Sequence, residues 1–236
     1  MMRKAAAKNF QKKDFRYRGH EVKRIEAFSD AVFAFAVTLL IVSLEVPKTF
    51  EELIATMKGF FAFGVSFILL MLIWHEQNVF FRRYALDDIY IIFLNGTLIF
   101  IVLFYVYPLK FLFTLIFNSV NAQVQIEQSQ VPQLMCIYSA GYIVIYFLFF
   151  LMYHHAAKKK DALELNDKEL FDTHTKMWAQ LILIMVGLLS IIAALILPAQ
   201  RSGMAGFAYF LIGPVFTVFY SRREKKRKEL IDGAIE

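Results

Sequence analysis

Residues 89–109 read IYIIFLNGTLIFIVLFYVYPL and contain no charged residue. A helix needs about 20 consecutive apolar residues to cross the hydrocarbon core of a bilayer, so this stretch predicts a transmembrane helix. Similar stretches recur on both sides of it, with the charged residues confined between them. These uncharged stretches are residues 31–44, 59–74, 128–153, 177–200 and 202–221. The sequence therefore predicts an all-α, polytopic membrane protein with six transmembrane helices, of which the first two are short for a span.

The composition supports lipid as the main solvent of this chain. Its residues are 58% hydrophobic and 17% aromatic, whereas only 19% are charged. So few polar side chains cannot cover a soluble globule of this length. The single cysteine, Cys136, excludes an intramolecular disulfide and a cysteine-clustered metal site.

The basic residues predict the orientation in the membrane, because short loops rich in lysine and arginine stay on the cytoplasmic side. Such residues gather before the first span and after the sixth, and in the second-to-third and fourth-to-fifth connections. The alternate connections have few. We expect both termini to be cytoplasmic, with a basic tail over residues 1–23, a six-helix membrane unit over 24–221 and a second basic tail over 222–236. Topology thus accounts for the net charge of +6, and we expect no nucleic-acid partner.

Asp30 is the polar residue that fits the membrane least. It lies about one turn inside the first helix, where a carboxylate needs a partner, water or a proton. Two interpretations stay open: Asp30 fixes helix packing through hydrogen bonds, or it takes part directly in transport. Arg24 is a candidate counter-charge, but six residues at about 100° each place it about 120° away around the helix. We therefore expect a network through a neighbouring helix.

Further along the same helix, Phe35, Thr38, Leu39 and Val42 point within about 60° of one direction at 3.6 residues per turn. This stripe is the candidate pore face. An apolar helical stripe is by itself far more typical of packing than of a pore.

Residues 24–40 read RIEAFSDAVFAFAVTLL. This string resembles the first-helix signature of the transmembrane protein 175 family of potassium channels, in which arginine and three further residues precede Phe-Ser-Asp and a small apolar run ends in Thr-Leu-Leu. The resemblance extends to Trp74 and His75 at the end of the second helix, and to Asn95 and Pro108 in the third. A chain with one such unit is similar to the prokaryotic members.

The resemblance implies a homotetramer in a prokaryotic plasma membrane, with four copies of the first helix around a central pore. The family's hydrophobic constriction falls on Phe35, Leu39 and Val42, and Thr38 adds a ring of hydroxyl groups. The permeant ion is potassium, and no cofactor or resident metal is implied. A structural network behind the pore would consist of Arg24, Phe28, Ser29, Asp30, Trp74, His75 and Asn95.

Two other classes of function are alternatives to a channel. A proton channel or ion-coupled carrier would use Asp30 directly and would depend strongly on pH. A membrane-embedded enzyme or scaffold would need Asp, Glu and His side chains clustered at one depth, whereas the spans carry only scattered ones. The sequence therefore favours a channel and does not predict an enzyme.

Overall fold

The computed structural model describes residues 15–42, 48–58, 60–117 and 126–232, and these ranges contain helices and no strand. The elements are α2 (Arg24–Val42), α3 (Phe50–Lys58), α4 (Phe60–Tyr84), α5 (Ile89–Phe117), η1 (Gln128–Gln130), α6 (Val131–Lys158), α7 (Asp167–Ile196), η2 (Ala199–Leu211) and α8 (Ile212–Asp232).

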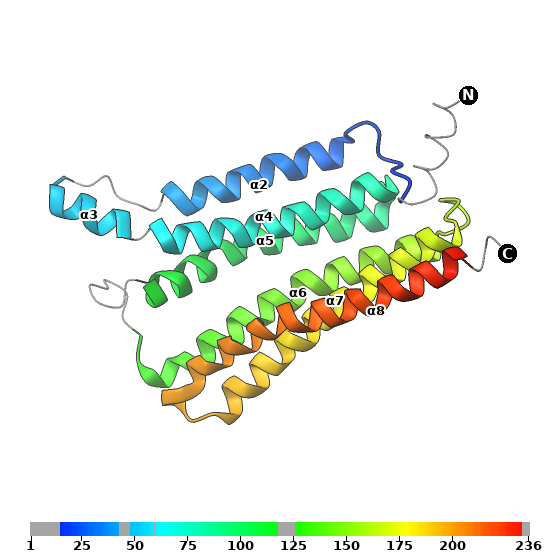
Figure 1. Ribbon diagram of the computed structural model, residues 1–236. Coiled ribbons are helices and arrows are strands. Elements are labelled where there is room, and N and C mark those ends of the chain that lie inside the picture. The colour runs from blue at the N-terminus through cyan, green and yellow to red at the C-terminus, as the bar shows by residue number, and fades with distance from the viewer. Residues whose placement is uncertain (1–14, 43–47, 59, 118–125, 233–236) are drawn as a thin grey trace.

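The long helices run side by side and form two groups (Figure 1). Helices α2, α4 and α5 contact one another, and α6, α7 and α8 make the second group together with the 3₁₀-helix η2. The contact between α5 and α6 joins the two groups. Helix α2 begins and α8 ends at the same end of the bundle, as an even number of membrane crossings requires (Figure 1).

The predicted all-α architecture with six long helical segments is confirmed. Within the described residues, five segments are long and apolar enough to span a membrane: α4, α5, α6, α7 and the run formed by η2 and α8. Helix α2 is shorter, with 19 residues. Two boundaries differ from the sequence prediction. Residues 50–58 form the short helix α3, and α4 continues to Tyr84 because its last turns bury large aromatic side chains, including Phe80 and Phe81.

The segment before α2, predicted as part of a basic tail, packs against both groups of helices over its described residues. Phe15 is buried with its ring edge-on to Tyr84, at the end of α4. Arg18 reaches α7 and places Nη2 2.8 Å from Glu169 Oε2 in a nearly buried ion pair. Residues 15–18 thus join the ends of α4 and α7. Helix α8 in turn continues through the basic residues 222–228 to Asp232.

Asp88 connects the two groups at the same end of the bundle. Its Oδ1 accepts hydrogen bonds from the backbone N–H groups of Tyr90 (3.1 Å) and Ile91 (3.2 Å), which caps the first turn of α5. Its Oδ2 lies 2.9 Å from Lys159 Nζ and 3.0 Å from His155 Nε2, beside the end of α6. One carboxylate therefore caps α5 and pairs with α6.

This arrangement predicts a pH-dependent contribution to stability. Partial burial would raise the pKa of the Asp88 carboxyl, but the hydrogen bonds from Lys159 and His155 outweigh burial and lower the pKa to about 2. A lowered pKa stabilises the fold above the ordinary pKa of about 4, and the effect is lost as the pH falls through about 2. We expect Asp88→Asn to lower the unfolding temperature in detergent at pH 6, and the difference from the wild type to shrink below about pH 3. A difference that is the same at both pH values would contradict the assignment.

Candidate functional site

One face of α2 is buried against α4 and α5. Its buried side chains recur at alternating steps of three and four residues, the spacing that keeps a row on one side of an α-helix. They are Glu26, Ser29, Phe33, Ala36 and Leu40. This face is used for packing within the chain, so any pathway along α2 must follow the other face.

The opposite face of α2 is not covered by any other part of the chain that the structure describes. Phe35 is 56% exposed, and Thr38, one turn further on, is exposed too. Leu39 lies at the edge of this face, where it is half-buried and packs against the core. The predicted stripe is therefore divided, with Phe35 and Thr38 pointing outward and Leu39 partly inward. Val42 ends the helix, and its side chain lies outside the described residues.

The hydroxyl of Thr38 has a defined direction. Its Oγ1 donates a hydrogen bond to the carbonyl oxygen of Phe35 at 2.7 Å. The proton is thus used within the helix, and the oxygen lone pairs remain available as acceptors. An exposed hydroxyl held in this way suits a cation or a water molecule that donates a proton.

A chain of hydrogen bonds fixes the buried face of α2. Ser29 Oγ donates to the carbonyl oxygen of Ile25 (2.7 Å) and accepts from Asn95 Nδ2 of α5 (2.8 Å). Asn95 Oδ1 in turn accepts from Gln77 Nε2 of α4 (2.8 Å). All three polar side chains are buried. Because these bonds are directional, they set the rotation of α2 relative to α4 and α5.

A second polar contact lies beside this chain. The indole N–H of Trp74, on α4, donates to Asp30 Oδ1 at 2.7 Å. Within the described ranges, Arg24 and His75 make no hydrogen bond or ion pair with Asp30. Phe28 is 61% exposed. The residues expected behind the pore are therefore divided: Ser29 and Asn95 form one contact, Asp30 and Trp74 another, and Arg24, Phe28 and His75 lie outside both.

Sequence reasoning missed two residues of this region. Gln77 completes the hydrogen-bond chain, and the signal for it was an amide placed among the apolar residues that α4 buries. Lys110, on α5, brings Nζ to 3.1 Å from the carbonyl oxygen of Leu40. The last carbonyls of a helix lack partners within the helix, so Lys110 satisfies one near the end of α2. Over the described residues, no three His, Cys, Asp or Glu side chains come together as metal ligands would.

Comparison with known proteins places these features in a family. The family profile "Endosomal/lysosomal potassium channel TMEM175" matches residues 24–108, which include α2, α3, α4 and most of α5. A relative named "Potassium channel", from Marivirga tractuosa, is 39% identical over 232 residues and covers 92% of this chain and 94% of its own length. The chain belongs to the TMEM175 family. The family and this named relative are ion channels.

Solved structures agree with the membership of this TMEM175 chain. The potassium channel MtTMEM175, solved as its T38A variant in complex with a nanobody–MBP fusion protein, aligns with a TM-score of 0.78 and 38% identity. The alignment covers 90% of this chain and 98% of that one. A lysosomal potassium-selective channel TMEM175 homologue from Chamaesiphon minutus shares the fold, with a TM-score of 0.56, 22% identity and coverage of 85% and 96%.

The buried hydrogen-bond chain predicts a large effect of Asn95→Leu. This change leaves the Gln77 amide buried without its acceptor, which costs about 1–3 kcal/mol. We expect a lower unfolding temperature in detergent. Thr97→Val is the matched control, because among the described residues the Thr97 hydroxyl bonds only to the carbonyl oxygen of Phe93 in its own helix (2.9 Å). Equal losses of unfolding temperature in the two variants would show that the buried hydrogen-bond chain makes no special contribution to stability.

Proposed function

We propose that this TMEM175 chain is a potassium-selective channel in which four copies of α2 surround a central pore. The observation that carries the proposal is the uncovered face of α2, with Phe35 and Thr38 outward while Ser29 on the opposite face is bound to Asn95. Membership of a family of potassium channels supports the choice of ion.

In this proposal the side chains and water of the pore select the ion. An unbroken helix uses its carbonyl groups for its own hydrogen bonds, so α2 has none to offer as a carbonyl filter. Thr38 supplies a side-chain oxygen on the exposed face of α2. Its lone pairs stay available because its proton is donated to the Phe35 carbonyl oxygen. Four such hydroxyls would face a partly hydrated cation with their lone pairs, and potassium loses its water more readily than sodium.

The gate of the proposed pore is apolar. Phe35, Leu39 and Val42 would form successive rings, and a narrow ring of apolar side chains stops ions because water leaves it. Phe35 is larger than the isoleucine or leucine common at this position in the family. Four larger side chains would make this ring narrower, so opening would require the four helices to move apart or the ring of Phe35 to rotate.

Asp30 acts in this proposal as a brace. Its carboxylate already accepts the Trp74 N–H, so it joins α2 to α4 beside the pore wall. The alternative, in which Asp30 carries protons or couples an ion, predicts that Asp30→Asn abolishes transport while assembly persists. The brace predicts partial transport, because an asparagine oxygen still accepts the indole N–H.

The apolar helices and the channel family indicate an integral membrane protein. We place it in a prokaryotic plasma membrane with both termini cytoplasmic. The relative from Marivirga tractuosa supports this compartment, and the basic ends of the chain support the orientation. The proposal includes no enzymatic activity, cofactor or nucleic-acid partner; the partners are lipid and three further copies.

The pore assignment predicts that Phe35→Ala increases ion flux. Removing the ring widens the constriction and keeps water in it, so purified protein in liposomes should pass potassium faster and discriminate less against sodium. A loss of about 1 kcal/mol of discrimination corresponds to about a fivefold lower ratio of potassium to sodium flux. Fluxes are measured separately under potassium, sodium and proton gradients.

Phe100→Ala is the matched control. Phe100 lies on α5 and is 66% exposed, so it tests the same truncation on another helix. We expect its fluxes to equal those of the wild type. Unchanged flux in Phe35→Ala would remove α2 from the pore, and wild-type protein that passes no potassium would contradict the proposed function.

A further inference from the structure

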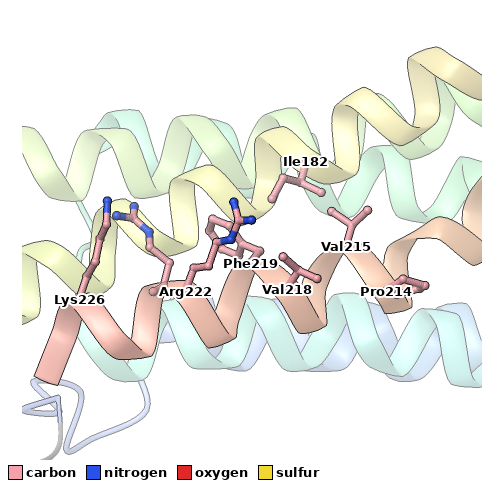
Figure 2. A pocket seen from close by; sticks show the side chains of 8 residues that line it. Ile182, Pro214, Val215, Val218, Phe219, Arg222 and Lys226 are labelled. Carbon is pink, nitrogen blue, oxygen red and sulfur yellow. The ribbon is translucent and has the colours of Figure 1, made fainter.

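Helices α7 and α8, which belong to the group of helices that does not contain α2, line an open apolar groove of about 520 Å³ (Figure 2). Ile182 contributes one wall from α7, and four apolar side chains contribute the other from α8. These are Pro214, Val215, Val218 and Phe219. The groove is closed at one end by cations: Arg222, Arg223 and Lys226.

Order along α8 gives the groove two chemically different ends. Figure 2 shows Pro214 and Val215 at one end, and Arg222 and Lys226 at the other, with Phe219 between them. From Val215 to Lys226 the helix advances about 16 Å, at about 1.5 Å per residue. The groove is therefore long and apolar, and one of its ends is positively charged.

The neighbouring carboxylates do not neutralise these cations. Asp172 is paired with Arg227 at 3.0 Å, and Glu224 with Lys228 at 3.2 Å. Among the described residues, Arg222 and Lys226 form no ion pair or hydrogen bond.

Arg223 is held in place without a carboxylate. Its guanidinium lies over the ring of Phe171, 4.7 Å from the centroid, and over that of Phe219 at 5.8 Å. Its Nε is buried and has no hydrogen-bond partner in the described part of the chain. Arg223 also lines the groove, so the rest of its guanidinium can donate to an acceptor group that enters there.

We propose that this groove binds an anionic phospholipid of the cytoplasmic leaflet. One acyl chain would lie along Val215, Val218 and Ile182, and the phosphate would accept hydrogen bonds from Arg222, Arg223 and Lys226. The charge complements the ligand, because basic clusters at the cytoplasmic end of a membrane helix attract anionic headgroups. The apolar length selects a lipid over a soluble phosphate. This site lies apart from α2 and goes beyond the proposed conduction of ions.

The test counts the lipids retained by purified full-length protein. Protein in detergent is mixed with equal amounts of phosphatidylglycerol and phosphatidylcholine that carry the same acyl chains, and the bound lipids are counted by native mass spectrometry. We expect the wild type to retain phosphatidylglycerol about tenfold over phosphatidylcholine. The combined change Arg222→Gln, Arg223→Gln and Lys226→Gln should bring this ratio close to one.

The matched control removes three other cations from the same side of the membrane: Lys158→Gln, Lys160→Gln and Lys225→Gln. None of these lines the groove, and the lipid preference should persist. A control that loses as much preference as the groove variant would overturn the proposal in favour of general surface charge. Retention of the full preference by the groove variant would overturn it as well.

A second variant tests the apolar part. Val218→Trp fills the groove and leaves all three cations in place, so both lipids should be lost from the site. Glycerol phosphate at the lipid's concentration should displace nothing, since it lacks an acyl chain. Displacement by glycerol phosphate would show a site for soluble anions, and loss of a protein oligomer with Val218→Trp would show a contact between copies. Either result would overturn the proposal.

Discussion

The architecture depends on how a helix is held at membrane depth when only one of its faces is covered. Water is absent there, so a buried polar side chain must find its partner in the protein. Ser29, Asn95 and Gln77 satisfy one another in a single chain of bonds that crosses from α2 to α5 and α4. Apolar packing alone would tolerate rotation of α2 about its axis. Directional bonds do not, and a rotation by one residue would turn Phe35 by about 100°.

The same constraint gives the two groups of helices different tasks in the proposed tetramer. Helices α4 and α5 pack against α2 so that its opposite face stays uncovered, while α6, α7 and α8 form the second group. Glu76 of α4 is a further link between the two groups. Its carboxylate lies 2.8 Å from Lys176 Nζ of α7 and accepts a hydrogen bond from the Tyr153 hydroxyl of α6 at 2.8 Å. The proposed lipid groove lies in the second group, so a lipid there would contact α7 and α8 and not the pore helix α2 itself.

The sequence predicted the features that depend on composition and local pattern. Long runs without charge gave the helices, and the Phe28-Ser29-Asp30 string gave the family. The missing parts depend on tertiary contacts. In the sequence, only the polarity of Gln77 distinguishes it from its neighbours, and its position beside Asn95 depends on how α4 packs against α5. Leu39 shared a stripe with Phe35 by angle alone, but the neighbouring helices cover part of it. The charge of Arg24 suggests it as a partner for Asp30, yet it is Trp74 of α4 that donates a hydrogen bond to the carboxylate. The roles assigned to these residues in conduction remain predictions.

The proposed pore requires that the outward face of α2 lines the ion pathway. The most direct measurement introduces Thr38→Cys in a Cys136→Ser background and follows potassium flux from liposomes while a cationic thiol reagent is added. Phe100→Cys in the same background is the comparison. If Thr38 faces the pore, the reagent stops flux through Thr38→Cys and leaves Phe100→Cys unaffected. Undiminished flux through a fully labelled Thr38→Cys channel would contradict it.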